Sequence, residues 1–148
     1  MAKDKLKIIL TDDDIDDRMF FEDAIEEINI ASELKTFNHG QDLMSYLCND
    51  CKELPNLIFL DLNMPIKNGM ECLIDIRKTP KLQSIIVAIY STSSSEEDIE
   101  EAFVNGANIY INKPTSFKEL KKVIKKVLQI NWQYQTSNLN KDNFLLRI

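Results

Sequence analysis

The chain has 148 residues, of which 44% are hydrophobic and 28% are charged, so it can bury one sizeable core but not two. This near-average composition excludes a disordered or fibrous chain, and the formal net charge of −6 argues against direct binding to nucleic acid. The apolar runs are far shorter than a membrane span, and the charged start has no signal-peptide apolar region behind it. We therefore expect a cytoplasmic protein that neither crosses a membrane nor binds nucleic acid directly.

The first half of the chain alternates short apolar runs with segments of helical periodicity, as βα units around a parallel sheet do. A first strand is predicted at residues 6–10. A helix is predicted at residues 15–28, because apolar residues recur there at helical spacing among acids. A short second strand is predicted at 34–37, and Gly40 then leads to a helix that carries Leu43, Met44 and Leu47.

The second half continues the same alternation. The remaining strands are predicted at residues 57–60, 85–90 and 109–111. A loop with Pro65 and Gly69 leads to a short helix through Ile74 and Ile76, which Pro80 ends. Two further helices are predicted from their capping-box spacings, which are Ser95 with Asp98 and Ser116 with Glu119. The first of them runs to Asn105 and Gly106.

Five βα units in this order predict an α/β fold with a doubly wound, flavodoxin-like parallel sheet and helices on both faces. The predicted domain covers residues 1–130. Residues 131–148 are expected to form a C-terminal tail, too short to be an output domain. The tail ends in Phe144, Leu145, Leu146 and Ile148, for which docking on the domain or disorder is the favoured interpretation, with partner or dimer contacts as the alternative.

Two other patterns have simple structural explanations. The last helix carries a dense basic run, which we interpret as a solvated face: Lys118, Lys121, Lys122, Lys125 and Lys126. Cys48 and Cys51 form a C-x-x-C pair, but the only other cysteine is Cys72 and the only histidine is His39. We therefore expect neither a zinc site nor a disulfide framework.

Polar residues stand where the predicted strands end, and the strands themselves are apolar. Asp12 and Asp13 follow the first strand, Asp61 the third, Ser91 the fourth and Lys113 the fifth. A single aspartate in such a place is most simply a helix cap or a solvated loop residue. Because the carboxyl ends of parallel strands meet at one edge of the sheet, however, this set is expected to converge, which capping alone does not explain.

Three carboxylates in one pocket repel each other unless a cation compensates them. Mg²⁺ suits this site, because it prefers oxygen ligands and keeps waters in its remaining positions. Lys113 adds a compact positive charge and the Ser91 hydroxyl a hydrogen-bond donor, both suited to a phosphoryl group. The pattern therefore predicts a magnesium site that accepts a tri-oxygen anion on a carboxylate.

Taken together, these motifs resemble the signature of response-regulator receiver domains of two-component signalling: Asp12-Asp13, Asp61-Leu62-Asn63-Met64-Pro65, Ser91 and Lys113-Pro114. The intervals of 30 residues from Asp61 to Ser91 and 22 from Ser91 to Lys113 are similar to those of the family. The resemblance covers residues 5–130. Around residues 91–98 it extends to stand-alone receivers of the phytochrome-associated or chemotaxis-regulator-like type.

The resemblance implies that Asp61 is a nucleophile that takes a phosphoryl group from a phosphohistidine, with Ser91 and Lys113 as the other catalytic residues. It implies that Asp13 and Asp61 bind Mg²⁺ directly, that the backbone carbonyl of Asn63 completes the protein ligands, and that Asp12 acts through water. Asp14 leaves open a shift of this assignment by one residue. No cofactor other than Mg²⁺ is expected.

The resemblance also implies a switch. Tyr110 takes the place of an aromatic residue that swings inward as the Ser91 hydroxyl is drawn to the phosphoryl group, although an ordinary edge-strand residue is the simpler alternative.

The expected partners are a histidine kinase or histidine phosphotransfer protein and a downstream protein, and the expected state is a monomer or weak homodimer. Thr92 replaces a smaller residue of many receivers, which predicts slower phosphotransfer, and Asn63 and Ser93 leave the lifetime of the phosphorylated state open.

Three other functions are less consistent with the sequence than a receiver. A haloacid-dehalogenase-like phosphatase would use the D-x-D within Asp12-Asp13-Asp14, but it does not explain the run that begins at Asp61. A structural pseudo-receiver is disfavoured because competent residues fill all acceptor-site positions. A nucleotide-binding domain is disfavoured because none of the three glycines lies in a phosphate-cradling motif.

Overall fold

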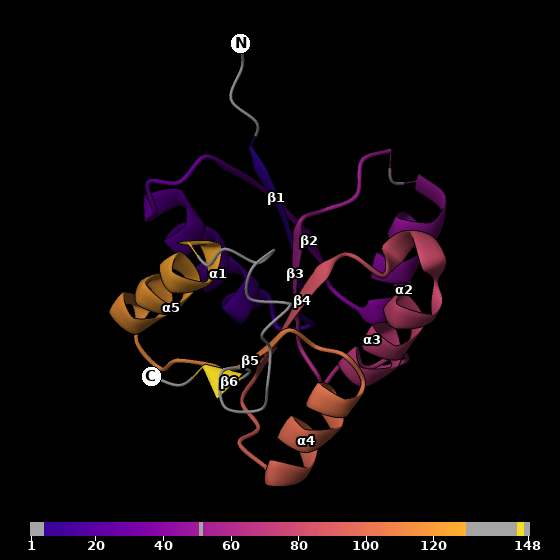
Figure 1. Ribbon diagram of the computed structural model, residues 1–148. Coiled ribbons are helices and arrows are strands. Elements are labelled where there is room, and N and C mark those ends of the chain that lie inside the picture. Colours follow the sequence, from indigo (N-terminus) through magenta and orange to yellow (C-terminus); the bar gives the residue numbers. More distant parts are fainter. Residues whose placement is uncertain (1–4, 51, 130–144, 147–148) are drawn as a thin grey trace.

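The computed structural model describes residues 5–50, 52–129 and 145–146, and in it the chain forms one parallel sheet covered on both faces by helices (Figure 1). The strand order is β2-β1-β3-β4-β5-β6, and every pairing is parallel. The strands are β1 (Leu6–Thr11), β2 (Ser32–Phe37), β3 (Leu57–Leu60), β4 (Ile86–Ser91), β5 (Ile109–Asn112) and β6 (Leu145–Leu146). The predicted doubly wound α/β fold is confirmed.

The helices lie in two layers. Helices α1 and α5 cover one face of the sheet, and α2, α3 and α4 cover the other (Figure 1). Their bounds are α1 (Ile15–Glu27), α2 (Gly40–Ser45), α3 (Gly69–Lys78), α4 (Glu96–Val104) and α5 (Phe117–Gln129). A π-helical turn, η1 (Tyr46–Asp50), extends α2, and a 3₁₀ turn, η2 (Pro80–Leu82), follows α3. Among the described residues, no helix has the length and apolar character needed to cross a bilayer.

Alternate side chains of the strands build two separate cores. Ile9, Ile58 and Ile89 lie in the core under α2, α3 and α4. Leu10, Phe59 and Ile111 lie in the core under α1 and α5. Because helices cover both faces, successive strand residues are all buried, which explains why β3 is a continuous apolar run rather than an alternating one.

The strand order places a topological switch point at the centre of the sheet. Strand β1 pairs with β2 on one side and with β3 on the other, so the crossovers that follow β1 and β3 run to opposite faces. Loops leaving the carboxyl ends of β1 and β3 therefore lead to helices on opposite faces of the sheet. Asp12, Asp13 and Asp61 stand at these two ends, which is where open α/β sheets bind their ligands.

A sixth strand was not predicted. In β6, Leu145 is aligned with Tyr110 and Leu146 with Ile111, so the end of the chain adds to the edge of the sheet beside β5. This agrees with the expectation that the apolar end of the chain docks on the domain. The rest of the predicted tail, residues 131–144 and 147–148, lies outside the described residues, as does Cys51 of the C-x-x-C pair.

The helix caps confirm part of the predicted pattern and correct one detail. Ser95 caps α4 by accepting a hydrogen bond from the Asp98 backbone N–H. The Asp98 carboxylate does not reach back to complete the predicted box; it accepts a hydrogen bond from the Ser93 hydroxyl at 2.6 Å. A complete capping box occurs instead at α3, between Asn68 and Glu71, where none was predicted.

The basic face of α5 lies as predicted. The side opposite the core is solvated at Lys118, Lys122, Lys125 and Lys126. Lys121 is half-buried and pairs with Glu27 of α1 at 3.0 Å. The lysines therefore form a solvent-facing stripe with one contact to the neighbouring helix.

Candidate functional site

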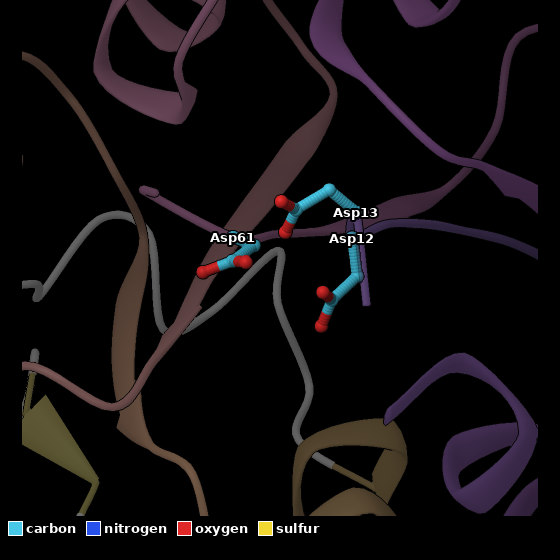
Figure 2. Close-up of side chains that lie close together, drawn as sticks. All are labelled: Asp12, Asp13 and Asp61. Carbon is cyan, nitrogen blue, oxygen red and sulfur yellow. The ribbon is translucent and has the colours of Figure 1, made fainter. Parts of the chain in front are cut away.

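Three carboxylates meet at the switch point. Oxygen atoms of Asp12, Asp13 and Asp61 all lie within 4.8 Å of one another, and Figure 2 shows the three side chains converging on one space. Asp12 and Asp61 are buried, whereas Asp13 is exposed. Their positions follow from the backbone, since the Asp61 N–H donates to the Thr11 carbonyl at 3.0 Å and so extends the pairing of β1 and β3. The predicted convergence of these residues is confirmed.

Asp14 has a different role from its two neighbours. Its carboxylate caps α1 by accepting hydrogen bonds from the backbone N–H groups of Asp16, at 2.8 Å, and Asp17, at 3.3 Å. The Asp12 carboxylate in turn accepts from the Asp14 N–H at 3.0 Å. The Asp14 carboxylate is thus turned toward the helix, whereas the carboxylates of Asp12 and Asp13 join that of Asp61.

The loop after β3 depends on a glycine. A Cβ atom on Gly69 would lie 2.2 Å from the backbone oxygen of Asp61, so only glycine lets α3 begin against the end of β3. The Gly69 N–H donates to the Leu62 carbonyl at 3.1 Å. Ile66 in the same loop has a φ of 70°, an unfavourable conformation for a β-branched residue, so backbone strain lies close to the candidate site. The Asn63 N–H donates to the Asp61 carboxylate at 3.4 Å.

Lys113 brings a positive charge from the end of β5. Its ammonium lies 2.8 Å from an oxygen of Asp12, 2.9 Å from one of Asp17 and 3.7 Å from one of Asp61. The side chain is only 9% exposed, and the ammonium also lies 5.2 Å from the ring centroid of Tyr90. The sequence analysis did not predict Asp17 as a site residue. In the sequence it is one of several acids on a solvated helix, and its partner Lys113 lies 96 residues away.

In the described part of the chain, the clustered carboxylates outnumber the one ammonium group that lies beside them. The pKa of Asp61 is raised to about 7, chiefly by burial and also by the negative charge of Asp12, against the opposing effect of Lys113. For Lys113, burial acts to lower the pKa, but its hydrogen bonds to the carboxylates of Asp12 and Asp17 outweigh burial and raise the pKa. A single ammonium therefore does not neutralise the three clustered acids, and a second positive charge fits the site.

The donor set fits Mg²⁺. Three carboxylates from two strand ends offer hard oxygen ligands, one of them solvent-exposed, and Asp61 is held at a raised pKa that a nearby cation would lower. The same oxygen set also suits Mn²⁺.

Ser93 connects the predicted Ser91 and Tyr110 positions. The Ser91 hydroxyl oxygen is buried and accepts a hydrogen bond from the Ser93 N–H at 3.0 Å. The Ser93 carbonyl accepts from the Tyr110 hydroxyl at 2.8 Å and from the Asn112 amide at 3.2 Å. Tyr110 is fully buried in the core beneath α2, α3 and α4, and its strand pairs with β4 on one side and β6 on the other.

Comparison with known proteins agrees with this site. Residues 8–125 match the family model of the response regulator receiver domain. The chain is 30% identical over 129 residues to the probable methanogenesis regulatory protein FilR2 of Methanothrix harundinacea, covering 85% of this chain and 83% of the relative. It is 31% identical over 121 residues to the response regulator Rcp1 of Synechocystis, covering 79% and 82% of the two chains.

Solved structures show the same likeness. The phosphorylated cyanobacterial phytochrome response regulator RcpA superposes with a TM-score of 0.78 at 30% identity, covering 93% of this chain and 98% of that one. The Mn²⁺-bound form of Rcp1 superposes with a TM-score of 0.74 at 30% identity, covering 82% and 90%. The resemblance to phytochrome-associated receivers is confirmed, and the phosphatase alternative gains no support. This chain belongs to the response regulator receiver domain family and is a signalling switch of two-component systems.

Proposed function

We propose that the chain takes a phosphoryl group onto Asp61 from a phosphohistidine on a partner histidine kinase or histidine phosphotransfer protein, in the presence of Mg²⁺. One observation carries this proposal: the buried Asp61 carboxylate lies within 4.8 Å of two other carboxylates and 3.7 Å from the Lys113 ammonium. A nucleophile, a metal-binding oxygen set and a positive charge are thus assembled at one strand end, as phosphoryl transfer requires.

In the transfer, an oxygen of the ionised Asp61 carboxylate attacks phosphorus as the phosphorus–nitrogen bond of the phosphohistidine breaks. The bonding electron pair leaves with the imidazole nitrogen, and an acyl phosphate remains on Asp61. Lys113 binds a phosphoryl oxygen through its ammonium, and the Ser91 hydroxyl donates a hydrogen bond to another. When bound, Mg²⁺ would neutralise negative charge that builds up during the transfer.

We assign the metal ligands as in the receiver family. Asp13 and Asp61 bind the ion directly, the backbone carbonyl of Asn63 completes the protein ligands, and Asp12 acts through a bound water. The exposed carboxylate of Asp13 supports this assignment, because a cation can enter from its side. The cap formed by Asp14 supports its exclusion from the ligand set.

In this proposal, phosphorylation changes the surface that binds a downstream protein. The Ser91 hydroxyl moves toward the phosphoryl group and draws with it the Ser93 N–H that donates to its oxygen, which shifts the loop whose carbonyl accepts from Tyr110. Tyr110 then adjusts inside the core and changes the face formed by α4, β5 and α5, which binds a downstream protein. We assign the receiver to residues 1–130 and propose that it acts in the cytoplasm as a monomer or weak homodimer.

Intact-mass measurement after incubation with acetyl phosphate tests the proposal. The wild type should gain one phosphoryl group in Mg²⁺ and none in EDTA, and Asp61→Ala should gain none. Locating the adduct by peptide mass separates the rival chemistry, since the phosphatase mechanism would put it on Asp12 and the proposed mechanism puts it on Asp61. If the wild type shows no adduct, beryllofluoride binding distinguishes rapid hydrolysis from a pocket that does not accept phosphate. Failure of both would leave a pseudo-receiver.

A further inference from the structure

The Lys113 ammonium has two close carboxylate partners, and neither is the acceptor. It contacts Asp12 at 2.8 Å and Asp17 at 2.9 Å, whereas its distance of 3.7 Å from Asp61 is beyond hydrogen-bond range. The ring of Tyr90 lies 5.2 Å from the same ammonium and is itself buried. The ammonium is therefore held at one side of the pocket by an acid that belongs to α1.

The dipole of α1 is a simpler explanation for an acid at position 17, but it does not account for the contact with Lys113. Acidic residues in the first turn of a helix interact favourably with the helix dipole, and both Asp16 and Asp17 lie in that turn. The dipole accounts equally for both residues. Only Asp17 is partly buried and in contact with Lys113, whereas Asp16 is exposed, so the contact with Lys113 is a separate property of Asp17.

We propose that Asp17 is a positioning residue that tethers the Lys113 ammonium away from Asp61, so that it competes with the phosphoryl group for this lysine. The inference rests on the proposed function, since it concerns the same acceptor site. Asp17 lies on α1, apart from the site residues at the carboxyl ends of the strands. In this proposal it controls how readily the site reaches its phosphorylated form.

The competition follows from geometry and charge. A phosphoryl oxygen on Asp61 would be a new anionic acceptor for the Lys113 ammonium, and any turn of the ammonium toward it costs part of the contact with Asp17. That contact joins a lysine that is 9% exposed to an aspartate that is 39% exposed, so solvent screens it only in part. Removing the Asp17 charge removes this cost and makes the phosphoryl-bound state more favourable.

Beryllofluoride, a stable mimic of the phosphoryl group, provides the test. We expect Asp17→Asn to lower the dissociation constant of beryllofluoride at saturating Mg²⁺ by about threefold to tenfold, as expected for a half-buried ion pair. Asp16→Asn removes the same charge from the same turn and controls for long-range electrostatics; its dissociation constant should stay within about twofold of the wild type. Asp17→Glu keeps a carboxylate and should restore the wild-type value.

A double-mutant cycle isolates the role of Lys113. In a Lys113→Met background, Asp17→Asn should change the affinity no more than Asp16→Asn does, because the tethered group is absent. The same cycle measured in EDTA by urea unfolding should show coupling between Asp17 and Lys113 without metal or ligand.

The outcomes separate this inference from the proposed function. If the wild type does not bind beryllofluoride in Mg²⁺, the proposed function fails and the tether fails with it. If the wild type binds but Asp17→Asn behaves like Asp16→Asn, or binds more weakly, only the tether is overturned.

Discussion

The Tyr110 hydroxyl donates a hydrogen bond to the Ser93 carbonyl at 2.8 Å, which ties the middle of β5 to the loop that follows β4. Asn112 donates to the same carbonyl at 3.2 Å. Both donors lie on β5, with Ile111 between them, so this strand holds the loop that follows Ser91. The loop is therefore restrained by side chains rather than by sheet pairing alone.

Tyr110→Phe removes one of these donors while keeping the ring in the core. We expect the free energy of unfolding to fall by about 1 kcal/mol, because the Ser93 carbonyl keeps its bond from Asn112. Urea denaturation of the metal-free protein measures the change. In an Asn112→Ala background the same substitution should cost more, since the carbonyl then loses both donors. Equal stability of Tyr110→Phe and the wild type would show that the hydroxyl contributes nothing to the resting form.

The pKa of Asp61 predicts how stability depends on pH in EDTA. Burial raises this pKa from 3.8 to about 7, so the folded protein binds the Asp61 proton more tightly than the unfolded chain does. The resulting stabilisation is complete below about pH 4 and is lost as the pH rises through 7. Asp61→Asn has no carboxylate at this position and therefore does not lose this stabilisation. Its free energy of unfolding minus that of the wild type should grow from near zero at pH 4 to roughly 2–4 kcal/mol at pH 8.

The exposed Asp16 offers a control for this pH series. Asp16→Asn should show no such growth, since that carboxylate lies outside the buried pocket. Thermal or urea unfolding at pH 5 and pH 8 is sufficient to measure the trend. A constant difference between Asp61→Asn and the wild type over this range would contradict the raised pKa.

Neighbouring aspartates should respond differently to Mg²⁺. Asp13→Asn should lose most of the stabilisation by Mg²⁺, which for an intact site reaches about 2.7 kcal/mol at a concentration one hundred times the dissociation constant. Asp14→Asn should keep it, because asparagine preserves the cap of α1 and Asp14 lies outside the carboxylate cluster. Thermal unfolding with and without Mg²⁺ gives both values. The reverse pattern would move the metal ligands one residue along the chain.

Arg77 should be important for stability, although it lies outside the candidate site. Its guanidinium leaves α3 and donates to four acceptors at 2.8–3.0 Å, which are the carbonyls of Gln83, Ile85 and Gly106 and the side chain of Asn108. Arg77→Met keeps much of the apolar stem but leaves these acceptors without their donor, so we expect a loss of about 2–4 kcal/mol. The exposed neighbour Lys78→Met should change stability by less than about 0.5 kcal/mol. Similar urea midpoints for the two variants would contradict this role.

Much of the fold was predictable because its signals are local. Strand β3 lies between two helix layers, so its apolar run stands out and Asp61 is conspicuous where it ends. The same reasoning identified the ends of β4 and β5, with Ser91 and Lys113. Each of these inferences needs only the residues of one element and the rule that parallel strands share a carboxyl edge.

Other features were missed because they join distant parts of the chain. The contact between Asp17 and Lys113 spans 96 residues, and the one between Arg77 and Asn108 spans 31. In the sequence, Asp17 and Arg77 are ordinary charged helix residues. Their roles depend on which side of the helix faces a neighbour, and this follows from packing rather than from periodicity alone.

The sequence by itself therefore determined the order of strands and helices, the strand-end carboxylates and the family resemblance, because apolar periodicity and motif spacing are local properties. Only the tertiary structure decided that Asp14 caps α1 while Asp13 joins the cluster, that Tyr110 is buried, and that Leu145 pairs beside β5. These outcomes depend on distances between elements, and such distances are set when the crossovers pack both faces of the sheet.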